Sequence, residues 1–302
     1  MALSPAKPSA RLSAPENTPR LHPAKLLSLW HLTSLDAPSV AIVWCLAFAH
    51  SAEVALPFWL PLVLGLSAWA FYVGDRLLDV VKAQRQPASG QNLQPRHLFH
   101  WQHRRLLLPM AMTAAIAALA LVLRDMPAAA RQRNSLLAAA ALAYFSSVHA
   151  PGSFPLPRLR HALRIPRIPK ELLVGLIFTT ACILPTWSRI PSGRLAFLPV
   201  FLTFAALAWL NCHAIEVWES AGSRHLPGIA RAGIFLATIT LLGAGMFLLF
   251  SQHHIATLMA TAAAGSMALV LLNARQHPFA PTILRAAADL VLLTPLGVFL
   301  LP

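Results

Sequence analysis

Long apolar runs follow one another along almost the whole chain, separated by short charged or proline-rich stretches. A helix needs about 20 apolar residues to cross a lipid bilayer, and most of these runs approach or exceed that length. Of the 302 residues, 57% are hydrophobic and 11% are charged, whereas about 25% of an average soluble domain is charged. These features exclude a soluble globular enzyme as the default and predict an all-α, polytopic membrane protein.

The runs that are bounded by charges or prolines predict nine transmembrane helices. They lie near residues 26–52, 57–80, 105–124, 131–150, 169–188, 195–218, 228–250, 254–273 and 281–301. Asp36 and Pro38 interrupt the first of them. Residues 1–25 are rich in proline and scattered basic residues and have no continuous apolar stretch, so we expect a disordered cytoplasmic tail followed by one membrane domain over residues 26–302.

Basic residues outnumber acidic ones by 24 to 10, which gives a formal net charge of +14. No stretch alternates basic residues with exposed aromatic ones, so we expect no nucleic-acid partner. With the N-terminus in the cytoplasm, 19 Lys and Arg residues fall on that side of the membrane and 5 on the other. The positive-inside rule then places the C-terminus outside, in a plasma membrane or bacterial inner membrane.

Two aspartates, Asp75 and Asp79, end the second apolar run. At a spacing of four residues, their carboxylates project from one face of a helix. Such a pair holds Mg²⁺ while leaving coordination positions open for phosphate oxygens. The basic residues that follow are candidates for binding phosphate: Arg76, Lys82, Arg85 and Arg96. A solvated helix end with an ordinary mixture of charges explains the same residues equally well.

Two glutamates, Glu216 and Glu219, end the sixth run in a similar way, and Asn211 and His213 lie deeper in it. Ionisable groups at membrane depth are costly and usually face an interior cavity, so these residues are site candidates. The alternatives are that Glu219 pairs with Arg224 at the membrane surface and that His213 is a hydrogen-bonded core residue. Four of the ten acids thus gather at two equivalent helix ends, which suggests an internal duplication around one site.

A basic, proline-rich connection, Arg158–Lys170, precedes the fifth apolar run. Its prolines prevent a continuous amphipathic helix, and we expect it to contact the headgroups of anionic membrane lipids. Lys170 and Glu171 are the first residues of the fifth run. The alternative interpretation is that they direct a charge toward an interior cavity of the protein.

Two other groups of polar residues have their own interpretations. His97, His100 and His103 recur at every third residue, which suits either a metal site or, more simply, an interfacial amphipathic helix. Asp289 lies inside the ninth run, one turn after Arg285, and we expect these two to form an internal ion pair.

The acidic ends of the second and sixth helices resemble the UbiA superfamily of intramembrane prenyltransferases. That family has an NDxxDxxxD motif after its second helix and a second aspartate-rich motif after its sixth. Asp75 and Asp79 match the last two aspartates of the first motif, and Arg76 matches a common arginine between them. Arg85, followed by Pro87, resembles the Arg and Pro that end this motif, at a shorter spacing.

This sequence also departs from the family pattern. Phe71 and Tyr72 stand where the family has the opening Asn and Asp of the first motif. In the second motif, Asn211, Glu216 and Glu219 are the substitutes for the usual aspartates. These differences leave the resemblance of the scaffold intact and remove one expected metal ligand.

The resemblance implies a bundle of nine helices and a Mg²⁺-dependent transfer of a prenyl group from a polyprenyl diphosphate to an aromatic or lipid-like hydrophobic acceptor. The metal ligands that it implies are Asp75, Asp79, Glu216 and Glu219. The residues expected to bind the diphosphate are Arg76, Lys82, Arg85 and Lys170. The residues expected to line the pocket are Phe71, Tyr72, Asn211 and His213.

Two alternative functions stay open. One is a member of the same fold that has lost catalysis and that binds an isoprenoid or quinone or supports a partner enzyme. The other is a small membrane transporter, although the sequence has no pair of Gly- or Pro-broken helices of the type that transporters use.

Overall fold

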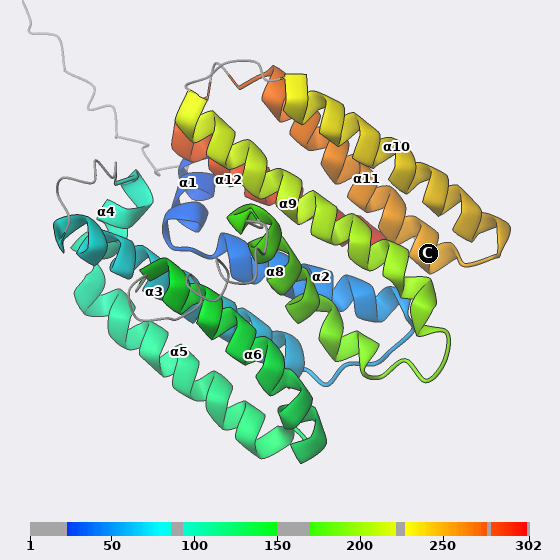
Figure 1. Ribbon diagram of the computed structural model, residues 1–302, viewed down its shortest axis with the longest axis horizontal. Helices are drawn as coiled ribbons and strands as arrows, with labels where there is room; N and C mark the ends of the chain where they lie inside the picture. Colours follow the sequence, from blue (N-terminus) through cyan, green and yellow to red (C-terminus); the bar gives the residue numbers. More distant parts are fainter. Residues whose placement is uncertain (1–22, 86–92, 150–168, 222–226, 277–278, 301–302) are drawn as a thin grey trace, which may run out of the picture.

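The computed structural model describes residues 23–85, 93–149, 169–221, 227–276 and 279–300. Within these ranges the chain is helical and has no β-strand, which confirms the all-α prediction (Figure 1). The α-helices are α1 (Pro23–Leu32), α2 (Asp36–Ser51), α3 (Trp59–Arg85), α4 (Pro95–Gln102), α5 (Arg104–Asp125), α6 (Ala128–His149), α8 (Lys170–Trp187), α9 (Leu198–Ala221), α10 (Pro227–Leu249), α11 (His253–Ala274) and α12 (Pro281–Val291). The 3-10 helices are η2 (Arg194–Phe197) and η3 (Thr294–Phe299).

Each of the nine apolar runs coincides with helical structure, but the first and the last are broken. The first run forms α1 and α2, which meet at an angle of 89°. Asp36, the expected interruption, is the first residue of α2. The last run forms α12 and then η3. Of the expected N-terminal tail, residues 1–22 lie outside the described residues.

Within the described part of the chain, four helical segments are long and apolar enough to cross a membrane: α5, η2 with α9, α10 and α11. The bent pair of α1 and α2 makes a fifth if it counts as one span. Helices α3 and α6 are not among these segments. The apolar part of α8, Glu171–Trp187, has 17 residues, and α12 has 11, so both are short for a span. These apolar helices support an integral membrane protein. The count of nine transmembrane helices and the orientation of the termini stay predictions.

Helix α2 lies at the centre and contacts α3, α8, α11 and α12. Trp44 of α2 stacks on Phe204 of α9 with ring centroids 3.6 Å apart, and Phe48 packs beside both. The Trp44 indole N–H also donates to the Leu292 carbonyl just after α12, at 2.8 Å. A fully buried aromatic cluster therefore ties the first helices of the chain to the last.

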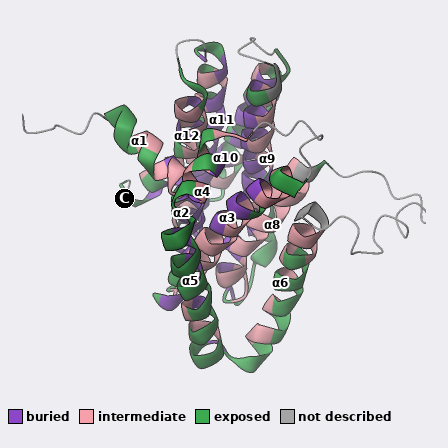
Figure 2. Ribbon diagram, turned by 90° about the vertical axis from the view of Figure 1, so that its left-hand side faces the viewer, coloured by how far each residue is buried: buried purple, intermediate pink, exposed green. Residues whose placement is uncertain are grey.

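Two groups of helices flank this centre (Figure 1). The group of α3, α5 and α6 lies on one side, and that of α9, α10 and α11 lies on the other, with α2 and α8 between them. The outer helices α5 and α10 bury only 22% of their spans, and Figure 2 shows the exposed surface of α5. An apolar outer face of this kind suits contact with lipid.

Candidate functional site

The charged ends of α3 and α9 both line one cavity of about 430 Å³. Further wall residues come from α2, α4, α6, α8 and α12. Both α3 and α9 end toward the left of Figure 1, where α4 also lies. The volume falls within the range of about 300–1,000 Å³ that is usual for small-molecule sites.

Charge is concentrated in this cavity. Seven of the ten acidic residues of the chain line it: Asp36, Asp75, Asp79, Glu171, Glu216, Glu219 and Asp289. Four basic residues share the wall: Arg76, Lys82, Arg96 and Arg285. Because charged groups inside a membrane protein are costly, their collection around one cavity marks it as the candidate functional site.

Most of the residues that the sequence indicates meet here. Those that line the cavity are Tyr72, Asp75, Arg76, Asp79, Lys82, Asn211, Glu216 and Glu219. Along α3 most of them recur every three or four residues, and along α9 they recur at intervals of five and three residues, which places them on one side of each helix. Predictions based on this helical spacing therefore located the two main walls.

Three candidates do not line the cavity, and the expectations for them are corrected. Phe71 lies one position before the cavity face of α3 and packs edge-on against Phe145, with ring centroids 4.9 Å apart. His213 lies off the cavity face of α9 and stacks on Trp209 at 5.5 Å. Arg85 is exposed at the last residue of α3. A step of one residue turns a helical side chain by about 100°, which explains the first two.

Helix α8 begins at Lys170, whose side chain lies outside the described residues. The next residue, Glu171, lines the cavity, as one interpretation of this pair expects. Asp36 also lines the cavity, although the sequence suggests only an interruption there. Asp36 is an ionisable residue inside an apolar run, and this feature could have identified it as a candidate site residue. Tyr144 of α6 lines the cavity without any comparable signal in the sequence.

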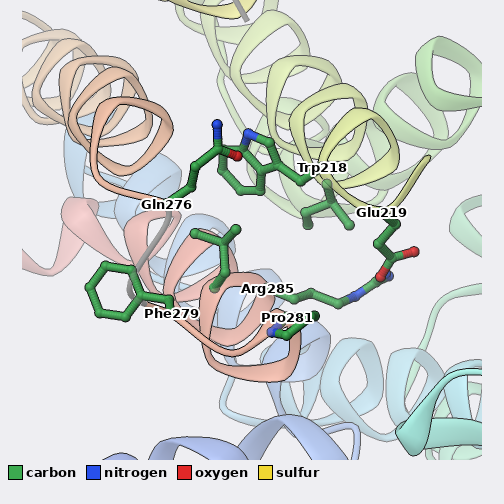
Figure 3. Close-up of a pocket in the computed structure, with 8 residues that line it drawn as sticks. Trp218, Glu219, Gln276, Phe279, Pro281 and Arg285 are labelled. Carbon is green, nitrogen blue, oxygen red and sulfur yellow. The ribbon is translucent and has the colours of Figure 1, made fainter. Parts of the chain in front are cut away.

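Three charged residues from three helices meet at one edge of the cavity. The Glu219 Oε1 atom accepts hydrogen bonds from Arg96 Nη1 of α4 at 3.0 Å and from Arg285 Nη1 of α12 at 2.7 Å. Figure 3 shows the Arg285 side chain extending toward Glu219, beside a small pocket of about 30 Å³ between α9 and α12. The direct contact of Arg285 is thus with Glu219, whereas the expected contact partner, Asp289, accepts a hydrogen bond from Asn211.

The arginines of the cavity keep unused donors. The Nε atoms of Arg76, Arg96 and Arg285 are buried and make no hydrogen bond with any described residue. Burial and the charges of Arg285 and Arg76 lower the pKa of Arg96 to about 9. Arg96 therefore stays charged at neutral pH, and the cavity offers guanidinium N–H groups to an anion.

The two aspartates of α3 contact basic partners. Arg76 Nη1 donates to Asp75 Oδ2 at 3.0 Å. The Gln94 backbone N–H donates to His97 Nδ1 at 3.1 Å, so the neutral ring carries its proton on Nε2, which lies 3.3 Å from Asp79 Oδ2. Burial lowers the pKa of His97, so the ring is neutral at neutral pH. Helix α4 therefore covers the acidic end of α3 and buries His97 and His100.

The acids that the resemblance implies as metal ligands do not form one compact set. Among the described residues, only His31, Asp36 and Asp289 place three metal-ligating atoms within 4.8 Å of one another. His97 and His100 of α4 and His103, which follows it, form no such group in the part of the chain that the structure describes, so the metal interpretation of their spacing is not supported. Asp75, Asp79 and Glu216 nevertheless share the wall of one cavity, where carboxylate oxygens suit Mg²⁺ together with phosphate oxygens.

Comparisons with family models, with curated proteins and with solved structures found no match to this chain. The resemblance to the UbiA superfamily therefore rests on the motif residues and on the order of the helices alone.

Proposed function

We propose that this protein is a membrane-embedded prenyltransferase of the UbiA type, which moves a prenyl group from a polyprenyl diphosphate to a hydrophobic acceptor with the help of Mg²⁺. The observation that carries the proposal is the single cavity in which the acidic ends of α3 and α9 meet four basic residues. A wall that combines these charged groups with apolar side chains suits a ligand with an anionic head and an apolar tail.

The diphosphate would bind at the arginines. Arg76, Arg96 and Arg285 have buried Nε donors that lack a partner among the described residues, and Lys82 lies on the same wall. Guanidinium groups bind phosphate oxygens through paired, charge-assisted hydrogen bonds. Positive charge at these positions also stabilises the negative charge that grows on a leaving diphosphate. In this proposal Arg96 and Arg285 have the diphosphate-binding role that the resemblance implies for Arg85.

Mg²⁺ would be held by Asp75, Asp79 and Glu216, whose oxygen ligands are of the type that this hard cation prefers. When bound, it supplies additional neutralisation of the diphosphate oxygens. We assign Glu219 to another task, because its Oε1 atom already accepts bonds from Arg96 and Arg285. In this proposal Glu219 positions the two arginines.

The prenyl chain would lie against the apolar part of the wall, which includes Val40, Val174, Phe178, Ala208 and Leu292. An apolar wall excludes water, so that a carbocation formed by loss of the diphosphate meets the acceptor before it meets water. The aromatic ring of Tyr72 lies on the same wall and offers a π face to positive charge.

Turnover of labelled prenyl diphosphates by the purified protein tests the proposal. We expect diphosphate release that needs Mg²⁺ and that falls at least about tenfold in Asp75→Asn and in Glu216→Gln, because each loses a ligand charge. Asp125→Asn is the matched control, since Asp125 lies outside the cavity and beside Arg124. Release that is absent from the wild type, or unchanged in both cavity variants, would reject the enzyme.

One observation favours a second candidate, a protein of this fold that binds prenyl diphosphates or quinones without catalysis. Asp75 is bonded to Arg76, and Glu219 is bonded to two arginines, so part of the acidic set is already neutralised within the chain. This candidate predicts that the lipid binds equally well with EDTA and that Asp75→Asn is tolerated. Binding measured with and without Mg²⁺ separates the two.

A further inference from the structure

The cavity has two polar layers at different depths. The outer layer is the contact between Glu219 of α9 and Arg285 of α12. Eight residues earlier on α9 and four residues later on α12, Asn211 Nδ2 donates to Asp289 Oδ1 at 3.0 Å. The two helices therefore run antiparallel here. At about 1.5 Å per residue, the inner layer lies about 12 Å along α9 from the outer one.

The inner layer is completed by the bend between α1 and α2. His31, near the end of α1, and Asp36, at the start of α2, are joined by His31 Nδ1 and Asp36 Oδ2 at 2.6 Å. The other Asp36 oxygen accepts the Ala37 backbone N–H at 2.9 Å. Ser34, within the bend, has a left-handed backbone with φ of 57°, which is uncommon for a residue with a side chain. The backbone is thus held in an unusual shape that brings His31 to Asp36.

Both acids of this layer, Asp36 and Asp289, line the cavity, and Asp289 is the more exposed of the two. Its Oδ2 atom lies 3.6 Å from His31 Nδ1, and its side chain is 18% exposed, against 5% for Asp36 and 2% for His31. Asp36 is already bonded through both oxygens. Asp289 is therefore the carboxylate of this layer that is best placed to accept a hydrogen bond from a molecule in the cavity.

Asn211, next to Asp289, has a side-chain oxygen that accepts no hydrogen bond from any described residue. A carboxylate accepts hydrogen bonds and donates none, so the Asn211 amide must turn its NH₂ group to Asp289. Its Oδ1 atom is buried and has no partner among the described residues, and the residue as a whole is 3% exposed. Both residues line the cavity, so an acceptor without a partner lies in the side chain next to the Asp289 carboxylate, and this arrangement suits a hydroxyl donor.

We propose that Asp289 and Asn211 form a hydroxyl-binding site in which Asp289 accepts the proton of a phenolic or enolic acceptor substrate. This assignment rests on the prenyltransferase function proposed above. The bond between the prenyl carbon and the diphosphate oxygen breaks, and its electron pair leaves on the diphosphate. A bond forms between the prenyl carbon and the acceptor oxygen, or between the prenyl carbon and a ring carbon whose hydrogen then moves to that oxygen. The hydroxyl proton passes to the Asp289 carboxylate.

A metal site is the competing interpretation of His31, Asp36 and Asp289, because their ligating atoms lie within 4.8 Å. The separation of 2.6 Å between His31 Nδ1 and Asp36 Oδ2 argues against it. Two ligands about 2.0 Å from one tetrahedral zinc ion stay about 3.3 Å apart. The observed distance is that of a charge-assisted hydrogen bond, so a proton lies between these atoms.

Binding of a simple phenol, followed by thermal unfolding of the purified protein in detergent, is the first test. We expect phenol to raise the melting temperature of the wild type and its O-methyl ether to have no such effect. Asp289→Asn keeps the shape of the side chain and its contact with Asn211, and it should lose the phenol response. Asp125→Asn should retain it. A wild type that does not respond to phenol, or an Asp289→Asn variant that responds fully, would overturn the site.

Transfer of the prenyl group is the second test. In Asp289→Asn we expect transfer to phenol to fall by about 100-fold or more, the usual contribution of a positioned base, while diphosphate binding is retained. Equal transfer by the variant would overturn the role of Asp289 as proton acceptor. A wild type that binds phenol through Asp289 but turns over no prenyl diphosphate would reject the proposed function and support the hydroxyl site alone.

Discussion

Glu219 holds two cationic side chains at the edge of the cavity. Its Oε1 atom accepts from Arg96 and Arg285, and the side chains of all three are less than a third exposed. Without the negative charge of this carboxylate, the two positively charged guanidinium groups would repel each other more strongly. The positions of Arg96 and Arg285 therefore depend on one acid that comes from a third helix.

Glu219→Gln should lower the melting temperature of the purified protein, by the equivalent of about 2 kcal/mol, because hydrogen bonds to charged groups contribute on that order. Pyrophosphate should raise the melting temperature of this variant more than that of the wild type, since the anion replaces the lost charge. Glu53→Gln is the control, because the Glu53 side chain is 78% exposed and outside the cavity. Equal pyrophosphate responses in all three proteins would contradict this role.

His100 attaches α4 to the bend between α1 and α2. It is fully buried, its Nδ1 donates to the Arg96 carbonyl at 2.8 Å, and its Nε2 lies 3.2 Å from the Ser34 hydroxyl. Burial, with the charges of Arg76 and His97, lowers the pKa of His100. A buried ring that stays neutral in the folded protein, but protonates near pH 6.5 when unfolded, stabilises the fold above that pH.

Stability should therefore decrease as the pH falls below about 6.5, by up to about 1.4 kcal/mol per pH unit for one such group, until the folded pKa is reached. Thermal unfolding between pH 8 and pH 5 measures this slope. His100→Asn should flatten the slope even if its overall stability is lower, whereas His103→Asn, at an exposed position, should not. An unchanged slope in His100→Asn would exclude this contribution.

Helical spacing is the reason that the residues on α3 and α9 were predictable, whereas their partners were not. The face of α9 that contains Asn211, Glu216 and Glu219 follows from intervals of three to five residues. The pairing of Glu219 with Arg285 joins positions 66 residues apart, and no local pattern encodes that distance. Ionisable residues in apolar runs show that a site exists, but the tertiary fold decides which of them meet.

Helices α8 and α9 approach closely where they form the cavity wall. A Cβ atom at Gly175 would lie 3.2 Å from the Trp209 backbone nitrogen and 3.4 Å from the Ala205 carbonyl oxygen. Both neighbours are backbone atoms and cannot rotate away. Small residues at helix contacts are a common device in membrane proteins, because they let two backbones pack together.

Gly175→Ala should therefore push α8 away from α9 and destabilise the protein by about 1–3 kcal/mol, the usual range for an overpacked contact. Gly245→Ala on α10 is the matched control, because no atom lies within 4 Å of the added Cβ there. The control should be neutral or slightly stabilising, since alanine favours the helix. Thermal unfolding of both variants checks the prediction, and equal melting temperatures would contradict the close contact.

Element boundaries were predictable where apolar runs are long and uninterrupted, as in α5, α10 and α11. The bend of 89° between α1 and α2 was not, although Asp36 and Pro38 marked its place. A break in hydrophobicity shows where a helix ends, but it carries no information on the angle at which the chain continues. That angle is what brings His31 to the inner layer of the cavity.

The molecule as a whole places two groups of helices around one charged cavity, and this arrangement underlies the proposed function. Each group supplies one acidic helix end, α3 from the first and α9 from the second, while α4 and α12 add the arginines that bind Glu219. The apolar runs fix the membrane class of the chain, and the scarce charges locate its site.

Isothermal titration of farnesyl diphosphate into the detergent-solubilised protein, with Mg²⁺ present, is the most direct test of the cavity as a prenyl diphosphate site. We expect the wild type to bind, and Arg96→Ala and Arg285→Ala each to weaken the affinity about 10- to 100-fold, because each removes a charge-assisted contact. Arg104→Ala, whose guanidinium lies over the Trp101 ring outside the cavity, should bind like the wild type. No binding by the wild type, or equal affinities in all four proteins, would contradict the proposal.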